Sequence, residues 1–425
     1  MKKYFLAIAS FFIYSHISLG QVYPGQMDST FVPVRSHHYD PELTFDFCVN
    51  EPAWSNQVGI HSAFGSTDRL YFRKEVPVNH DNDLSSSYST TVWRGERANA
   101  QILVWSSEAL EQVRVSTQDL RSAEGNIIPK DRITFELVRY VLSNYPYAEK
   151  KAICGESPYK SGFLMPDRFE TLDRFDLPSQ TTRPVWMMVD VPRGTVPGTY
   201  KGQVEVRAKG KAPQLLNLEI VVQNQLLPYP KDWKYRLDLW QNPWAVAWYN
   251  HVEPWSPEHK MLLKQHLKHY ADAGGTYITT YGVHSPWSDN SYMIEGGMIE
   301  WIKKADGTWA FDYKIFDEYV ELAMECGIDE AITLYTPIPW GFRHRYKDEA
   351  TGDYSYINWA PSSEEFKKMW NIFLTDFKFH LEAKSWLDIT YIGINENPME
   401  ETLAAINVVR NHDKCWKITY AGNWH

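Results

Sequence analysis

The chain has 425 residues and a formal net charge of −10 at pH 7. Its length allows two or three domains, and its charge argues against nucleic acid or an anionic membrane as a partner, since both need clustered positive charge. Four scattered cysteines (Cys48, Cys154, Cys326 and Cys415) are too few for a disulfide scaffold or a zinc site, although an oxidising compartment would allow one or two bridges. We therefore expect no metal and no cofactor.

The N-terminus has the pattern of a secretory signal peptide, predicted to comprise residues 1–20. Two lysines precede an apolar segment at 4–13, and Ser18 and Gly20 place small residues before a predicted cleavage site at Gln21. This segment is too short to span a membrane, and no later stretch approaches ~18 uninterrupted apolar residues. We expect a secreted or periplasmic protein without a membrane span.

The chain is rich in aromatic residues, with 18 Trp and 26 Tyr. Most of these rings belong in an ordinary core. The remainder suit a ligand that is itself half apolar, and the C–H faces of sugars are such a ligand. A glycan is therefore the expected partner.

Residues 21–227 have the pattern of an all-β sandwich. Short alternating segments separated by Gly, Pro, Asp and Ser predict strands at 69–73, 100–105, 112–116, 133–138, 203–207 and 216–220. Residues 148–182 lack clear periodicity and are expected to form a long irregular connection. His37 and His38 are expected to be a solvated pair rather than a metal site.

Residues 231–425 alternate between strand and helix patterns, which predicts a parallel sheet with right-handed crossovers. Strands are expected at 236–240, 277–283, 331–335, 389–394 and 417–421, and helices at 257–273, 313–326, 362–381 and 400–411. Ser362 and Glu365 form a predicted capping box for the third helix.

The fold class predicted from these patterns is α+β and multidomain, a β-sandwich followed by a (β/α)8 TIM-type barrel. A closed barrel takes eight strand–helix units in roughly 250 residues. The region after residue 230 holds about four and a half such units, so we expect a barrel truncated after about five strands. An open five-stranded α/β sheet is the alternative.

The strand at 389–394 ends on Asn395 and Glu396. In a (β/α) barrel the chemistry takes place at the C-terminal ends of the strands, so Glu396 is the leading candidate for a catalytic acid. The alternative is that Asn397-Pro398 makes this segment only a strand-ending turn.

Several motifs accompany this pair: Pro184-Val-Trp186, Val191-Pro192, Gly198-Thr-Tyr200-Lys-Gly202 and a Leu-Pro linker. With an acidic residue at the fourth barrel strand, this pattern resembles glycoside hydrolase family 123 and its secreted Bacteroidetes-type relatives. The resemblance implies a β-N-acetylgalactosaminidase in which the substrate's own 2-acetamido oxygen attacks the anomeric carbon. An Asp stabilises the resulting oxazolinium, and an adjacent Glu protonates the leaving oxygen. Glu396 matches that Glu, whereas Asn395 stands where the family has Asp.

Replacing the Asp with Asn395 weakens a charge-assisted interaction of roughly 1.5 to 3 kcal/mol to a neutral hydrogen bond of ~1 kcal/mol. The expected loss slows the step about ten-fold, and Asn395 is expected to orient the acetamide by accepting its N–H. One alternative is a retaining glycosidase of the large clan in which Asn precedes the acid/base, with its nucleophilic Glu on a seventh strand. Another is a non-catalytic, degenerate glycan-binding protein.

Other strand ends carry aromatic and polar residues that could contact a sugar. These candidates are Trp240, Gln241 and Asn242 after the first strand, Tyr281 and His284 after the second, Tyr335 and Trp340 after the third, and Asn423 and Trp424 after the fifth.

Overall fold

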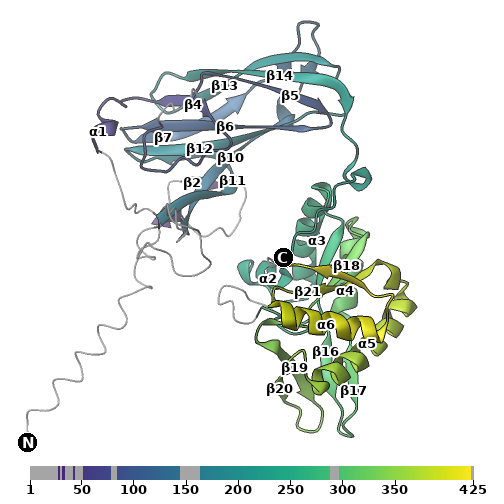
Figure 1. Ribbon diagram of the computed structural model, residues 1–425. Helices are drawn as coiled ribbons and strands as arrows, with labels where there is room; N and C mark the ends of the chain where they lie inside the picture. Colours follow the sequence, from purple (N-terminus) through teal and green to yellow (C-terminus); the bar gives the residue numbers. More distant parts are fainter. Residues whose placement is uncertain are drawn as a thin grey trace, which may run out of the picture. The chain divides into compact units, whose positions relative to one another are not determined.

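The computed structural model describes residues 27–28, 31–33, 42–43, 51–77, 84–143, 163–287 and 296–422. The chain divides into two compact units, Met1–Leu227 and Pro228–His425, each described here by itself (Figure 1). Several features predicted from the sequence lie outside the described residues: the signal peptide at 1–20, His37 and His38, Cys48, Cys154, Asn423 and Trp424.

The first unit is built on one large, mostly antiparallel sheet. Its main path is β4 (His61–Gly65), β6 (Arg97–Ser106), β12 (Thr181–Asp190), β10 (Ile133–Ser143), β11 (Phe163–Leu177), β7 (Leu110–Thr117), β13 (Gly198–Arg207), β14 (Gln214–Leu226) and β5 (Ser87–Arg94). Only the β14–β5 pair on this path is parallel. The short elements are β1 (Met27–Asp28), β2 (Phe31–Pro33), β3 (Glu42–Leu43), α1 (Glu51–Trp54), β8 (Leu120–Arg121), β9 (Ile127–Ile128) and η1 (Lys130–Arg132).

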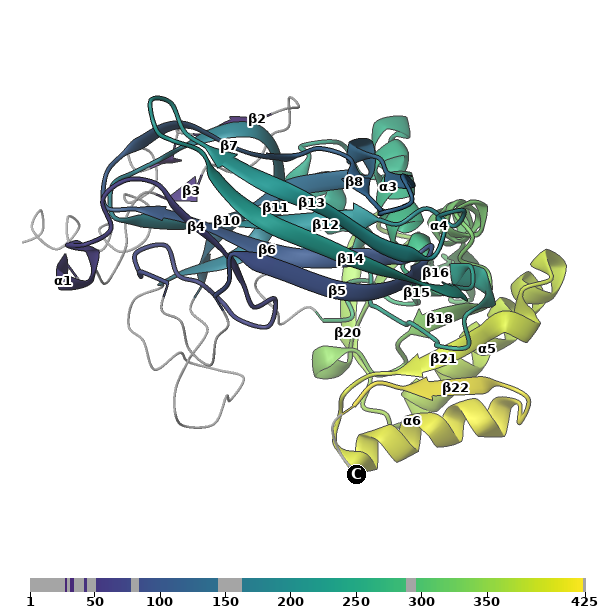
Figure 2. The same ribbon diagram turned by 90° about the horizontal axis from the view of Figure 1, so that it is seen from above.

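Alternating side chains from both halves of this sheet form one apolar core. Val204 on β13 lies opposite Leu216 on β14, and both side chains are buried. Ile102 on β6 and Val185 on β12, from the other half of the path, belong to the same core cluster. Figure 2 labels the four strands β6, β12, β13 and β14. Period-two alternation therefore predicts β6, β13 and β14 correctly, because one face of each strand is turned to the core.

Two predictions for this unit are wrong. Residues 69–73 are irregular rather than a strand, and the region 148–182, expected to be irregular, contains the long strand β11 and the start of β12. Register shifts explain why β11 shows no clear period: its pairing with β7 shifts between Phe175 and Leu177, and its pairing with β2 shifts between Leu172 and Arg174. Each shift moves side chains to the other face.

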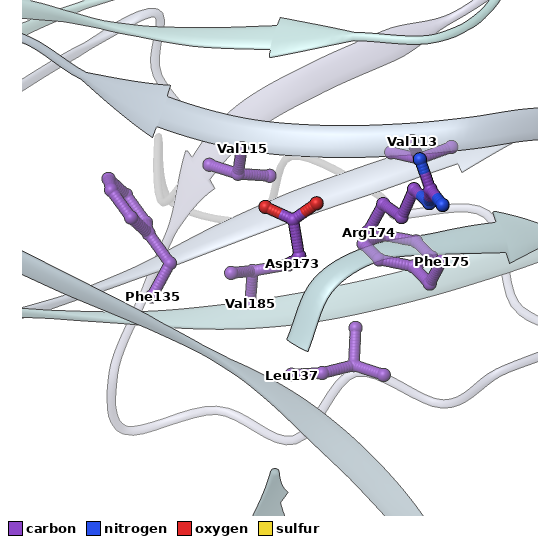
Figure 3. A pocket seen from close by; sticks show the side chains of 8 residues that line it. All are labelled: Val113, Val115, Phe135, Leu137, Asp173, Arg174, Phe175 and Val185. Atoms are coloured by element: carbon purple, nitrogen blue, oxygen red, sulfur yellow. The ribbon is translucent and has the colours of Figure 1, made fainter. Parts of the chain in front are cut away.

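A cavity of about 20 Å³ lies beside this irregular pairing, between β7, β10, β11 and β12 (Figure 3). Valine, leucine and phenylalanine side chains line it, together with Asp173 and Arg174. Its volume admits about one water molecule, so it is a packing defect and not a ligand site.

The second unit contains the predicted parallel sheet. Strands β15 (Tyr277–Tyr281), β18 (Ala331–Tyr335), β21 (Thr390–Ile394) and β22 (Lys417–Tyr420) pair in that order, and every pair is parallel. Helices α3 (Pro257–Asp272), α4 (Lys314–Glu325), α5 (Glu364–Lys384) and α6 (Met399–His412) alternate with them, as predicted. The shorter helical segments are α2 (Pro243–Tyr249), η2 (Pro230–Asp232), η3 (Trp340–Phe342) and η4 (Leu387–Ile389).

The strand expected at 236–240 is absent; an isolated parallel bridge between Leu237 and Gly275 stands in its place. The side chain of Tyr270 takes over backbone partners in this segment. Its hydroxyl accepts from the Leu239 N–H at 3.2 Å and donates to the Leu237 carbonyl oxygen at 2.8 Å.

A four-stranded sheet that the sequence patterns did not indicate is inserted in the second unit. Its order is β17 (Trp309–Asp312), β16 (Glu300–Lys303), β19 (Arg343–Asp348) and β20 (Tyr354–Asn358). It packs on α5, where Trp301 stacks on Phe373 with ring centroids 4.9 Å apart. Its strands are short and mixed in polarity, which leaves little periodicity to detect.

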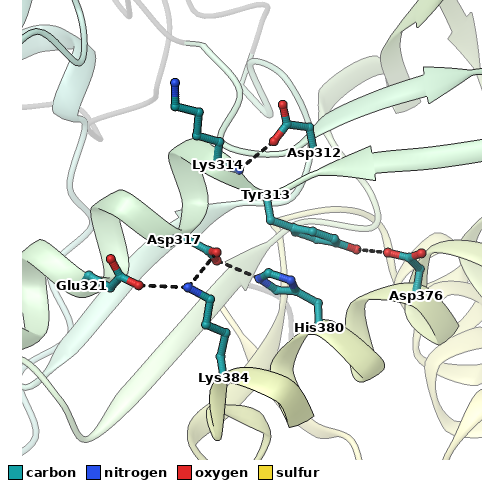
Figure 4. A network of polar contacts seen from close by, with 8 residues as sticks. All are labelled: Asp312, Tyr313, Lys314, Asp317, Glu321, Asp376, His380 and Lys384. Carbon is teal, nitrogen blue, oxygen red and sulfur yellow. Dashed lines mark hydrogen bonds and ion pairs between the residues drawn. The ribbon is translucent and has the colours of Figure 1, made fainter.

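The amphipathic face predicted for α5 is confirmed, because Phe366, Met369, Trp370, Phe373, Leu374, Phe377 and Leu381 are all buried. The predicted cap is one residue off: the Ser363 hydroxyl, not Ser362, accepts from the Phe366 N–H at 3.1 Å. A polar network joins α5 to α4 (Figure 4). Asp317 of α4 contacts both His380, at 2.7 Å, and Lys384, at 2.9 Å.

The inserted sheet is anchored by a buried neutral histidine, His344. Its Nδ1 donates to the Phe342 carbonyl oxygen at 3.0 Å, and its Nε2 accepts from the Trp370 indole N–H at 3.2 Å. Protonation would turn this acceptor into a donor facing another donor. Burial lowers the pKa of His344 to about 4, and the bond to Phe342 opposes this only in part.

We therefore expect the second unit to lose stability as the pH falls from about 6.5 to about 4. In this range the His344 imidazole binds a proton in the unfolded chain but stays neutral in the folded chain. The loss at the lower limit is up to about 3 kcal/mol. Urea unfolding at several pH values measures it. His344→Gln should flatten the pH dependence, while His269→Gln, at an exposed position of α3, should leave it unchanged; an unaltered slope in His344→Gln would contradict the assignment.

Candidate active site

The C-terminal ends of the parallel strands meet at one edge of the sheet. The register aligns Tyr281 with Tyr335 and Tyr335 with Gly393, so the residues that follow β15, β18 and β21 emerge together. Asn395 and Glu396 follow β21 at this edge. Asn395 is 1% exposed, whereas Glu396 is exposed to solvent. The pair thus divides into a buried amide and an accessible carboxyl group.

Trp287 fixes the orientation of the Asn395 amide. The Trp287 indole N–H donates to Asn395 Oδ1 at 3.1 Å. Since an indole nitrogen can only donate, the amide oxygen must face Trp287. The Asn395 backbone N–H donates to the Thr336 hydroxyl at 3.2 Å, while its Nδ2 is buried and has no hydrogen-bond partner among the residues that the structure describes. The Asn395 side chain therefore lacks an acceptor for its Nδ2 hydrogens.

Aromatic rings surround this pair. Trp240 stacks on Trp287 with ring centroids 4.8 Å apart and contacts Tyr335 at 4.9 Å. The Trp240 indole N–H also donates to the Tyr335 hydroxyl at 3.1 Å. Gly393 leaves room for this arrangement, since a Cβ there would lie 2.9 Å from the Tyr335 ring. Trp240 is the accessible ring of the three, at 45% exposure, and so the one best placed to stack on a sugar.

A second carboxyl group, Asp238, lies near these rings. Its Oδ1 is buried without a hydrogen-bond partner in the described part of the chain, and burial raises the pKa of this carboxyl group. Burial also raises the pKa of Tyr335 to about 12, and the negative charge of Asp238 acts in the same direction. Sequence reasoning missed Asp238 and Trp287. Asp238 could have been noticed because it is two residues before Trp240 in the same expected strand. Trp287 could have been noticed as a Trp in the segment that follows β15.

The other predicted sugar contacts differ in position. Tyr281 is buried, and its hydroxyl donates to the Gln241 carbonyl oxygen at 3.1 Å, so it supports the rings. Asn242 caps α2 by accepting from the Ala245 N–H and lines a cavity of about 190 Å³ beside α3. Trp340 donates its backbone N–H to the Pro286 carbonyl oxygen at 2.9 Å. Contact of each with a sugar stays a prediction.

His284 is half-buried beyond the end of β15. Burial lowers its pKa to about 4, and the positive charges of Arg345 and Arg343 act in the same direction. It is therefore a neutral imidazole at neutral pH.

Within the described ranges, no three His, Cys, Asp or Glu side chains gather as metal ligands would. Over the same ranges, no helix combines the length and the apolar character needed to cross a membrane.

Comparison with known families identifies the chain. The model described as the glycoside hydrolase 123 catalytic domain matches residues 240–425, and that of the glycoside hydrolase 123 N-terminal domain matches residues 64–208. The chain belongs to glycoside hydrolase family 123. The family predicted from the sequence motifs is thereby confirmed. A search of curated proteins found no match.

Among solved structures, a family 123 glycoside hydrolase from Clostridium perfringens, studied for glycolipid glycan hydrolysis, is 26% identical with a TM-score of 0.76. The match covers 86% of this chain and 64% of that enzyme. A family 39 glycoside hydrolase from Bacteroides cellulosilyticus is 13% identical, with a TM-score of 0.24 and coverage of 72% and 48%. A Bacteroides ovatus GH5 xyloglucanase is 11% identical, with a TM-score of 0.22 and coverage of 78% and 61%. TM-scores this low carry no structural argument.

Trp287→Phe should destabilise the second unit by about 1–3 kcal/mol, because it leaves Asn395 Oδ1 buried without its donor. Most of this loss should disappear in the background of Asn395→Leu, since no buried oxygen then needs a partner. Chemical denaturation of both single variants and the double variant gives the coupling energy. Trp244→Phe, at a buried ring of the same core, is the control and should lower the free energy of unfolding equally with Asn395 or Leu at position 395. An equal loss for Trp287→Phe in both backgrounds would refute the proposed role of the Trp287 N–H.

Proposed function

We propose that this protein is a glycosidase acting on β-linked N-acetylhexosamine glycans, with N-acetylgalactosamine as the terminal sugar, by substrate-assisted retaining hydrolysis. Membership of glycoside hydrolase family 123 supports the reaction class. The observation that carries the proposal is the contrast between two neighbouring residues at the end of β21. The Glu396 carboxyl group is accessible, whereas the Asn395 amide is buried and held in one orientation by Trp287. As parts of the same proposal, the four parallel strands belong to a (β/α)8 barrel and the chain is exported by residues 1–20.

In the proposed mechanism, the sugar packs on Trp240 with its glycosidic oxygen beside Glu396. The carbonyl oxygen of the 2-acetamido group forms a bond to the anomeric carbon as the bond to the leaving oxygen breaks, and Glu396 gives its proton to that oxygen. The resulting carboxylate then removes a proton from water, which opens the oxazolinium with net retention. Asn395 lies next to the acetamide and holds it in place for attack.

Glu396→Gln should lower the hydrolysis of N-acetylgalactosaminides by about 100- to 10,000-fold, because the amide cannot transfer a proton. The loss should be largest for alkyl leaving groups and smallest for nitrophenyl groups, which leave without protonation. Initial rates over a series of aryl glycosides measure this. Glu400→Gln, at an exposed position of α6, is the matched control. Equal losses for all leaving groups would exclude Glu396 as the proton donor.

The unpartnered Nδ2 of Asn395 supports a second candidate function, hydrolysis of sugars that carry a free 2-hydroxyl. A hydroxyl oxygen accepts from an amide N–H, whereas the N–H of an acetamide is itself a donor. In this candidate Glu396 is again the acid/base, and a carboxylate of the enzyme takes the place of the acetamide as nucleophile.

Asn395→Asp separates the two candidates. If the acetamide is the nucleophile, the new anion beside the oxazolinium should raise the rate on 2-acetamido substrates about ten-fold. If Asn395 donates to a 2-hydroxyl, the same change should lower the rate on unacetylated sugars. Assays of nitrophenyl N-acetylgalactosaminide and galactoside decide between them. No turnover of either substrate by the wild-type protein, with retained binding, would favour a non-catalytic glycan-binding protein.

A further inference from the structure

The hairpin of β19 and β20 presents a face that combines cations with aromatic rings. Arg343, Arg345 and Lys347 alternate along β19 with the buried or half-buried His344 and Tyr346. Opposite them on β20, Tyr356 pairs with Arg345 and Tyr354 pairs with Lys347. Both tyrosines are 50% exposed. We call this set of three cations and two tyrosines the basic face.

Each of the two arginines of the basic face lies over a tyrosine ring. The Arg343 guanidinium carbon lies 3.9 Å from the centre of the Tyr356 ring, and that of Arg345 lies 4.1 Å from the centre of the Tyr354 ring. Stacking uses the face of a guanidinium and leaves the N–H groups at its rim free to donate. An oxyanion can therefore approach in the plane of each group without displacing the ring.

The positive charge on this face is only partly balanced. Among the described residues, no carboxylate forms an ion pair with Arg343, and Arg345 meets only Glu300, at 3.6 Å. The Glu300 carboxylate also accepts from the Tyr354 hydroxyl at 3.0 Å. In a chain of net charge −10, an uncompensated arginine stacked in place needs a local explanation.

Protection of a sheet edge does not supply that explanation. Exposed edge strands often carry lysines that block pairing with another chain. Here the edge strand is β20, whereas the cations lie on β19, which is hydrogen-bonded on both sides by β16 and β20. Its side chains project from the face of the sheet, where they can meet a ligand.

The basic face lies next to the candidate active site. Strand β19 begins directly after Trp340–Phe342, and the Trp340 N–H is bonded to the carbonyl oxygen of Pro286, the neighbour of Trp287 in the chain. Arg343 and Arg345 are also close enough to His284, which follows β15, for their charges to lower its pKa. The start of β19, which carries Arg343, therefore lies near Trp287, whose indole N–H donates to Asn395.

We propose that Arg343 and Arg345 form a subsite for an anionic group, a sulfate ester or a carboxylate, on the glycan whose terminal sugar is bound at Asn395 and Glu396. This inference rests on the proposed glycosidase function and specifies its substrate class as acidic glycans. The arginines bind and position the substrate, and they take no part in bond cleavage.

Calorimetry on the full chain carrying Glu396→Gln tests the subsite without turnover. Sulfated N-acetylgalactosamine is compared with N-acetylgalactosamine, and N-acetylgalactosaminyl-glucuronate with N-acetylgalactosaminyl-galactose. The first pair tests a sulfate and the second a carboxylate. We expect the anionic member of at least one pair to bind about ten-fold more tightly, with a preference that shrinks as salt is added.

Arg343→Gln and Arg345→Gln should each remove most of that preference, and Arg343→Lys should restore only part of it because a lysine lacks the flat fork. Lys264→Gln, on α3, removes one exposed cation elsewhere and should leave the preference intact. Circular dichroism checks that each variant is folded. Equal affinity within both pairs, or a preference that survives both arginine changes, would overturn the proposal.

The proposed glycosidase activity and the anionic subsite are tested independently. If the wild-type protein hydrolyses neutral N-acetylgalactosaminides but shows no preference in either pair, the acidic-glycan inference is wrong and the proposed function stands. If it hydrolyses none of the substrates while the arginine-dependent preference persists, the subsite stands as part of a binding protein and the catalytic proposal is wrong.

Discussion

The hydrogen bond between Trp287 and Asn395 at the end of β21 is the interaction on which the candidate site depends. Strand β21 ends at Ile394, Asn395 stays buried, and Glu396, at the bend that follows, is exposed. The hydrogen bond from Trp287 then selects one orientation of the Asn395 amide. Trp240 stacks on Trp287, and Tyr335 receives the Trp240 N–H. One buried amide thus links side chains from three separate segments of the chain.

Regular patterns made much of this fold predictable from the sequence. Helix α5 has an unbroken apolar face, and β15, β18, β21 and β22 are short runs rich in β-branched and aromatic residues. The errors have physical causes. Register shifts in β11 break its alternation, and the Tyr270 hydroxyl replaces strand pairing around Leu237. The inserted sheet joins two short hairpins, β16–β17 and β19–β20, through a parallel pairing of β16 with β19, which are far apart in sequence, and no local period records that pairing.

The same distinction applies to the site. Asn395, Glu396, Trp240 and Tyr335 were predictable because each lies at the end of an expected strand. Trp287 lies six residues beyond the end of β15, and only the folded chain brings its indole to Asn395. Asp238 shows another limit of prediction from sequence. Its residue type is evident in the sequence, but its burial without a hydrogen bond to Oδ1 is a property of the tertiary structure alone.

The Asn at position 395 changes more than the charge of the site. A carboxylate can only accept hydrogen bonds, whereas an amide both accepts and donates. The Trp287 N–H takes one lone pair of the Asn395 oxygen, and among the described residues the group left without a partner is the Nδ2 donor, which favours an acceptor on the ligand. A donor placed against an acetamide N–H costs a hydrogen bond as well as an electrostatic attraction. The polarity that position 395 presents to a ligand therefore depends on Trp287 as much as on Asn395 itself.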